Sequence, residues 1–216
     1  MPDAPYLPPH GPIRILHQDA DLLVADKPQG LLSVPGKAAG GAECLLARLE
    51  EMVPGTRLVH RLDRDTSGVM VFARHARAQR HLGLQFERRH AEKGYVALVH
   101  GAPSDSSGEI DLPLTADWPN RPRQKVCHYS GKVARTAWQV IGRHPLGVRL
   151  ELRPETGRSH QLRVHLAEIG HPILGDPLYG PSGGRDARRM MLHAARLGLR
   201  HPTGGAAVAY TSPAPF

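Results

Sequence analysis

The sequence predicts an α+β fold, and three patterns of apolar residues support this prediction. Residues 148–152 alternate apolar and charged side chains, which is typical of a strand with one buried face. Residues 69–73 are all apolar and predict a fully buried strand. Residues 43–53 place leucines at helical spacing before a Pro-Gly pair that ends the segment. Strands and helices of these kinds in one chain indicate a sheet with helices packed against it.

The remaining elements follow in chain order, after residues 1–12, whose five prolines predict an extended arm. The rest of the chain, residues 13–216, is predicted to form one domain without a separate N-terminal module. We expect further strands at residues 13–16, 22–25, 93–101 and 136–141, a helix at residues 76–90, and a third helix that begins at an N-cap on Ser159 and ends at Ile169. Apolar stripes, which include Met52 in the first helix and Leu162 and Leu166 in the third, are expected in the core.

The chain is basic, with 28 lysines and arginines against 20 acidic residues, a net charge of +8 and a pI of about 10.0. Such a charge suits a nucleic acid or another polyanion as partner. It is equally typical of a soluble protein from an arginine-rich proteome. Composition alone therefore leaves both interpretations open.

Several classes of protein are excluded or disfavoured. The two cysteines lie far apart without a CxxC pair, which disfavours a zinc framework or disulfides and fits a cytoplasmic protein. No apolar run approaches the roughly 18 residues of a membrane helix. Phosphate-binding glycine motifs are absent. His160 and His165 are five residues apart, unlike the zinc-binding spacing of four. We therefore expect neither a metal nor a cofactor.

Residues 59–68, VHRLDRDTSG, place two carboxylates and two guanidinium groups within five positions, directly before the apolar run at residues 69–73. The turn-forming residues at its end put this cluster on a loop that enters the sheet. Loops held by a rigid strand often carry catalytic groups. Ordinary surface ion pairs would explain the same residues.

Two further segments have candidate functional residues. Residues 153–166, RPETGRSHQLRVHL, combine basic residues with the predicted third helix. Residues 117–126, DWPNRPRQKV, interleave basic residues with an aromatic, which suits looped RNA as well as a plain surface hairpin. Tyr95 lies in a predicted strand, where a packed aromatic is the simplest interpretation. Lys27 is either a phosphate contact or a solvated lysine.

The motifs HRLDxxTSG and TGRxHQLRxH, about 95 residues apart, resemble the two signatures of the RluA-type pseudouridine synthases. The resemblance extends through KPxGLLSVPG, K-x-Y-x-A and LGDPLYG, covers nearly the whole chain and shows no departure at motif positions. It implies the fold of these enzymes, a long mixed and mostly antiparallel sheet with flanking helices and a central active-site cleft. It also implies an isomerase that converts uridine in RNA to pseudouridine without a metal or cofactor.

The resemblance assigns roles to individual residues. Asp63 matches the catalytic residue, which either attacks C1′ or removes the 2′ proton. Arg163 matches the arginine that pairs with it. Tyr95 matches the active-site tyrosine that stacks on uracil, and Arg61 the residue that fills the gap left by the flipped base. The expected RNA contacts also include His60, Arg158, Arg121, Arg123 and Lys125.

The segment DWPNRPRQKV resembles the subgroup acting on both the tRNA anticodon stem-loop (expected position 32) and 23S rRNA (expected position 746). We expect a monomer without a membrane partner. Three alternatives stay open: a family member acting on a different large-subunit rRNA uridine, an RNA-binding protein without catalysis, and a glycoside hydrolase that uses Asp63 and Asp65.

Overall fold

The computed structural model describes residues 6–36, 43–181 and 183–216, so the first five residues of the predicted arm lie outside the described part. The chain divides into two compact units, one from Met1–Ala91 and Arg196–Pro213, the other from Glu92–Ala195 and Ala214–Phe216. The prediction of one domain over residues 13–216 stays a prediction, and each unit is described by itself. No helix in the described part of the chain is both long and apolar enough to cross a membrane.

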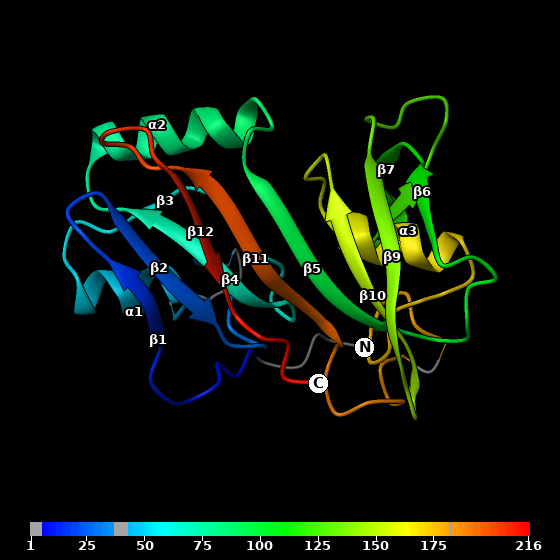
Figure 1. Cartoon of the computed structure of the whole chain (residues 1–216). Coiled ribbons are helices and arrows are strands. Elements are labelled where there is room, and N and C mark those ends of the chain that lie inside the picture. Colours follow the sequence, from blue (N-terminus) through cyan, green and yellow to red (C-terminus); the bar gives the residue numbers. More distant parts are fainter. Residues whose placement is uncertain (1–5, 37–42, 182) are drawn as a thin grey trace. The chain divides into compact units, whose positions relative to one another are not determined.

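The first unit contains antiparallel strands, which are labelled in Figure 1. Strand β2 pairs with both β1 and β4, β3 pairs with β4, and the C-terminal half of β11 pairs with β12. The strands are β1 (Arg14–Gln18), β2 (Leu22–Lys27), β3 (Arg57–Leu58), β4 (Ser67–Ala73), β11 (Leu192–Arg200) and β12 (Ala207–Thr211). Every residue of β4 is buried, which confirms the predicted buried strand.

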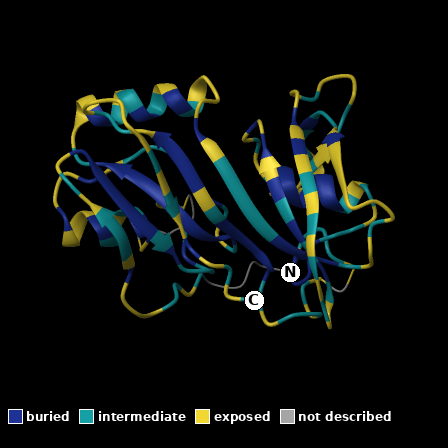
Figure 2. Ribbon diagram, in the orientation of Figure 1, coloured by how far each residue is buried: buried dark blue, intermediate teal, exposed yellow. Residues whose placement is uncertain are grey.

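Two helices belong to the first unit, α1 (Leu45–Met52) and α2 (Ala76–Glu87). Leu82 of α2 is buried with the apolar residues of β2 and β4, whereas much of the helix's outer side is exposed (Figure 2). The prediction that Met52 belongs to the core is wrong, because its side chain is 53% exposed. The buried face of α1 consists of Leu45 and Leu49, and the helix ends at Met52.

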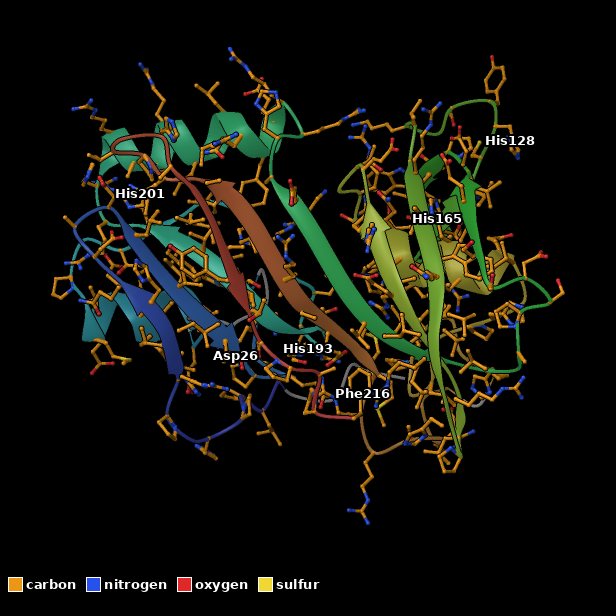
Figure 3. The ribbon with its side chains drawn as sticks, in the orientation of Figure 1. Asp26, His128, His165, His193, His201 and Phe216 are labelled. Atoms are coloured by element: carbon orange, nitrogen blue, oxygen red, sulfur yellow. The ribbon has the colours of Figure 1, made fainter. Side chains whose placement is uncertain are left out.

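A cluster of histidines and aspartates joins three turns of this unit. Asp19 accepts two backbone N–H bonds within its own turn through Oδ1, while its Oδ2 lies 2.7 Å from Nε2 of His17 and 3.0 Å from Nε2 of His201 (Figure 3 labels His201). Asp21 lies 2.8 Å from Nε2 of His75, whose Nδ1 caps helix α2. The cluster therefore connects the β1–β2 turn, the start of α2 and the turn after β11.

The charges in this cluster shift the pKa values of its members. The carbonyl of Thr203, 2.7 Å from Nδ1, and then the Asp19 carboxylate raise the pKa of His201, although burial opposes them. Burial alone would raise the pKa of Asp19, but bonds to His17, His201 and the backbone hold it well below its usual range. The protonated imidazole and the ionised carboxylate are thus the favoured forms in the folded state.

We expect the free energy of unfolding to fall as the pH rises above about 6.5, the ordinary pKa of histidine, because the pKa of His201 is raised in the folded state. A histidine with a raised folded-state pKa stabilises fully below its unfolded-state pKa, and that stabilisation is lost as the pH rises through the folded-state value. His201→Gln should make this decline smaller, as measured by urea unfolding at a series of pH values from about 6.5 upward. His128→Gln, at an exposed histidine of the second unit, is the control. An unchanged decline in His201→Gln would contradict the assignment.

The second unit is built on four antiparallel strands in the order β5-β10-β9-β6. These are β5 (Glu92–Val99), β6 (Ser107–Asp111), β9 (Arg135–His144) and β10 (Gly147–Pro154). Val148, Leu150 and Leu152 are buried in alternation with more exposed residues, which confirms the predicted one-faced strand. A separate hairpin is formed by β7 (Leu114–Ala116), a 3-10 turn η1 (Trp118–Asn120) and β8 (Gln124–Val126).

Helix α3 (Gln161–Glu168) packs Leu162 and Leu166 into the core of the second unit, as predicted. The predicted N-cap at Ser159 is wrong, because the helix is preceded by His160 in the left-handed conformation, φ 54° and ψ 17°. The segment before the helix is held by Gln161, whose side chain accepts the N–H of Arg158 at 3.0 Å. With three α-helices beside antiparallel strands, the described residues have the predicted α+β class.

Candidate active site

The signature loop of the first unit turns at Asp63, whose carbonyl accepts the N–H of Thr66 at 3.2 Å. The next carbonyl, of Arg64, is held by Nζ of Lys27 at 2.8 Å and by the N–H of Gly30 at 2.9 Å. Lys27 is fully buried and also donates to the carbonyl of Pro28. Neither interpretation of Lys27 as a phosphate contact or a solvated lysine is therefore correct. The side chain fixes the backbone of the loop.

Ser33 provides a second anchor, directly on the residue before Asp63. Its hydroxyl donates to the carbonyl of Leu62 at 2.7 Å and accepts the Leu62 N–H at 3.1 Å. Both polar groups of that buried backbone residue are thereby satisfied, as burial requires. The segment KPQGLLS thus fixes the backbone position from which the Asp63 side chain extends.

The side chains of the signature loop have different surroundings. Arg61 is exposed and Asp63 is half-buried. Arg64 binds Asp65 through two nitrogens at 3.0 and 3.1 Å, which agrees with a structural role for Asp65. His60 accepts the N–H of Val71 at 3.1 Å and stacks on Phe86 with ring centroids 4.5 Å apart. These contacts hold His60 against the body of its own unit.

The second motif forms a buried polar network around Gln161. Its Oε1 accepts the hydroxyl of Thr156 at 2.7 Å, and its Nε2 donates to the carbonyl of Arg135 at 2.9 Å and to Oγ1 of Thr136 at 3.0 Å. The Thr156 hydroxyl in turn accepts the Arg135 N–H at 3.0 Å. Each donor in this series of hydrogen bonds has an acceptor, so the network fixes the start of helix α3.

His165 completes the network from the middle of α3 (labelled in Figure 3). Its Nε2 lies 3.0 Å from the carbonyl of Leu112 and its Nδ1 lies 3.0 Å from Oγ1 of Thr136. Burial lowers the pKa of His165, although the Leu112 carbonyl opposes this shift, so the ring is neutral. Because a carbonyl only accepts, the proton lies on Nε2 and Nδ1 accepts from the Thr136 hydroxyl. His165 is therefore a structural histidine.

Arg163 forms a two-pronged ion pair with Asp176. Its Nε lies 2.7 Å from Oδ2 and its Nη2 lies 2.8 Å from Oδ1, and the two side chains are 4% and 0% exposed. Burial alone would raise the pKa of Asp176, but the bonds and charge of Arg163, helped by the N–H groups of Leu178 and Tyr179, lower it. Both partners are therefore charged, and the pair holds the guanidinium in one orientation.

The loop that presents Asp176 depends on Gly175, which has φ of +74°. A Cβ atom at this position would lie 1.9 Å from the carbonyl oxygen of Arg189, so only glycine fits. The preceding residue, Leu174, donates to the carbonyl of Leu98 and accepts from Met191. The loop is thus fastened to strand β5 directly before the ion pair.

Tyr95 lies on β5 opposite Leu152 of β10 and packs against the core of the second unit. Two positions earlier, Lys93 donates to the carbonyl of Thr156 at 3.0 Å. The K-x-Y segment and the TGR segment are therefore joined within one unit, which brings the predicted residues Tyr95, Arg158 and Arg163 into the same body. Arg158 is half-buried and donates to the carbonyl of Val133 at 3.1 Å.

The hairpin β7–β8 presents the remaining predicted RNA contacts at its surface. Arg121 lies over the ring of Trp118, 3.1 Å from its centroid, and the Trp118 side chain is 68% exposed. Arg123 lies 5.0 Å from the ring centroid of Tyr179, and Lys125 lies 3.4 Å from Asp117. A guanidinium on an exposed indole ring is a surface on which a nucleic-acid base stacks well.

Sequence reasoning did not identify several residues that shape these sites. Ser33, Asp176 and Tyr179 all lie in segments that match the family motifs, but their roles depend on contacts with other parts of the chain. Among the described residues, Asp19, Asp21 and His201 form a group of the kind that binds metals. The hydrogen bonds given above already account for these three side chains, so we assign no metal to them.

Comparison with known proteins identifies the family. The family model described as RNA pseudouridylate synthase matches residues 21–168. The chain belongs to the RNA pseudouridylate synthase family. Its members are isomerases, as predicted.

Individual relatives agree with this assignment. The chain is 46% identical over 214 residues, 98% of both chains, to the Dual-specificity RNA pseudouridine synthase RluA of Escherichia coli (strain K12), and 47% identical over 204 residues to the Yersinia pestis protein of the same name (94% of this chain, 99% of that one). The solved structure of Human RNA Pseudouridylate Synthase Domain Containing 1 matches with a TM-score of 0.80 and 30% identity, over 97% of this chain and 87% of that one. The predicted pseudouridine synthase fold is confirmed.

Asp176→Asn should destabilise the protein by about 3–5 kcal/mol, because it leaves the buried Arg163 guanidinium without a countercharge. Asparagine keeps the shape and still accepts the backbone N–H bonds, so the loss reports the charge. Asp111→Asn is the matched control, because its partner Arg135 is 48% exposed and such pairs contribute about 1 kcal/mol or less. Urea unfolding measures both variants, and an equal loss in the free energy of unfolding would contradict the larger contribution of the buried pair.

Proposed function

We propose that this chain converts uridine to pseudouridine in the anticodon stem-loop of tRNA and in 23S rRNA, with Asp63 as the catalytic residue. The observation that carries the proposal is the signature loop, in which buried Lys27 and Ser33 fix the backbone on both sides of a half-buried Asp63. The proposal of two RNA substrates is supported by the name of the relatives, which describes them as dual-specificity enzymes.

The reaction breaks the N1–C1′ bond of uridine, turns the uracil and forms a C5–C1′ bond, while the C5 proton leaves and N1 gains a proton. Nothing is consumed, so the proposal includes neither cofactor nor metal. Asp63 either attacks C1′ or removes the 2′ proton, and both routes need an ionised carboxylate. We assign to Arg163 the role of the cation that pairs with the Asp63 carboxylate, as the motif that contains it implies.

Tyr95 and Arg61 complete the proposed site. The ring of Tyr95 offers a face on which uracil stacks, and its phenol is suited to removing the C5 proton. Arg61 is exposed beside Asp63 in the sequence and is suited to filling the gap in the RNA after the base flips. Flipping costs a few kcal/mol and is least costly in a loop, which favours stem-loop substrates.

The hairpin, Arg158 and His60 are proposed to hold the RNA around the target. The contacts of His60 with Val71 and Phe86 also position the signature loop. Arg121, Arg123 and Lys125 present their charges on one short hairpin beside the exposed Trp118 ring. We propose that the protein acts in the cytoplasm, since Cys44 and Cys127 are free thiols that suit a reducing compartment. We also propose that it is a monomer.

Asp63→Asn should abolish turnover while RNA affinity stays within about tenfold, roughly 1.4 kcal/mol. The assay is release of tritium from uridine labelled at C5 in tRNA and in 23S rRNA fragments. Asp65→Asn, which removes only the pair with Arg64, should keep most of the activity. Turnover by Asp63→Asn would reject its catalytic role. Release of free uracil would indicate a hydrolase, and activity on one RNA alone would reject dual specificity.

Log affinity for RNA should fall linearly with log salt, by about 0.7 per neutralised phosphate of single-stranded RNA. Charge reversal at Arg121 and Arg123 should flatten this slope more than reversal at Arg77 and Arg80 of α2, because we assign the phosphate contacts to the hairpin. The hairpin variant should also change the ratio of tRNA to rRNA modification. A larger effect of the α2 variant, with an unchanged ratio, would identify the hairpin as a plain surface feature.

A further inference from the structure

Tyr179 contacts both the hairpin and the start of helix α3 in the second unit. The resemblance to the family motifs assigns it no role. It follows Asp176 by three residues, and Oδ1 of Asp176 accepts its N–H at 3.1 Å. The carboxylate that orients Arg163 therefore also fixes the backbone of Tyr179. The side chain packs against a buried cluster formed by Leu114 of the hairpin, Val164 of helix α3 and Ala134.

The ring of Tyr179 is shared by two guanidinium groups from different elements. Arg163 of α3 lies 5.1 Å from the ring centroid, and Arg123 of the hairpin lies 5.0 Å from it. Both distances are within the range of about 6 Å in which a cation is attracted to an aromatic ring. One of these arginines is buried beside Asp176 and the other is exposed at the surface.

The hydroxyl of Tyr179 makes a second link between the same elements. It accepts the backbone N–H of Gln124 in β8 at 2.7 Å and lies 2.8 Å from Nδ1 of His160. The arrangement that uses every group has the phenol donating its proton to Nδ1 of His160. His160 needs such support, because it precedes α3 in a left-handed conformation that residues other than glycine rarely adopt.

We propose that Tyr179 is a positioning residue that couples RNA contact at the β7–β8 hairpin to the orientation of Arg163. This inference rests on the proposed function, in which the hairpin binds RNA and Arg163 serves Asp63. RNA that engages Arg123 moves the neighbouring backbone of Gln124, whose N–H is bound by the Tyr179 hydroxyl. The same hydroxyl contacts His160 directly before α3, so the movement reaches the helix that carries Arg163.

The test is a double-mutant cycle between Tyr179→Phe and Arg123→Gln, with RNA affinity and the single-turnover rate at saturating enzyme measured on labelled tRNA. Phenylalanine keeps the ring but loses both hydroxyl contacts, so we expect the rate to fall about three- to tenfold, the usual scale for one hydrogen bond. Arg123→Gln should lower both affinity and rate. In the Tyr179→Phe background it should lower affinity but change the rate much less.

Arg121→Gln is the matched control, since Arg121 lies on Trp118 of the same hairpin. Its effect on the rate should multiply with that of Tyr179→Phe, because independent sites are additive in free energy. If the effects of Arg123→Gln also multiply, Tyr179 is a packing residue and the inference is rejected. Near-ultraviolet circular dichroism checks that Tyr179→Phe is folded.

A second variant keeps the test valid if Tyr179→Phe does not fold. His160→Asn removes the other partner of the hydroxyl, and asparagine tolerates the left-handed conformation. It should lower the single-turnover rate with little change in affinity, and an unchanged rate would reject the inference. A wild-type protein without turnover in the same assay would instead reject the proposed function itself, so the two failures are distinguishable.

Discussion

The buried ion pair between Arg163 and Asp176 is the interaction on which the functional part of the second unit depends. Two charges removed from water are costly unless each satisfies the other and the remaining polar groups find partners. Here the carboxylate also accepts two backbone N–H groups, and a glycine without space for a Cβ atom presents it. The strict geometry explains why so many neighbouring residues have structural roles.

Helix α3 carries polar side chains into the core for the same reason. Gln161, Arg163 and His165 are all buried, although a helix of eight residues would normally bury only an apolar stripe. Gln161 bonds to the hydroxyls of Thr136 and Thr156, and His165 bonds to the same Thr136 hydroxyl. The helix therefore cannot rotate or slide without leaving buried polar groups unpaired. The polar network therefore positions the Arg163 guanidinium more strictly than packing alone would.

Much of the fold was predictable because apolar periodicity reports burial directly, as in β4, β10 and the helix α2. The N-cap of α3 was not predictable, because Ser159 has the right chemistry, but the helix begins after His160, which makes no side-chain capping bond. The prediction for Lys27 failed for a similar reason: the residue type suggests solvent, whereas two backbone carbonyls and complete burial fix it. Local sequence shows which residues are present, but long-range backbone partners decide what charged side chains do.

An enzyme that isomerises its substrate without consuming anything obtains its rate enhancement chiefly from orientation and electrostatics. Such catalysis requires charged groups whose positions are set before the substrate arrives. In the first unit the cation Lys27 is directed to main-chain carbonyls rather than to solvent, and in the second unit Asp176 orients Arg163. Arg61 and the arginines of the hairpin are exposed, and under the proposed function the bound RNA sets their final positions. Fixed charges thus suit the chemistry, and adjustable charges suit the recognition of more than one RNA.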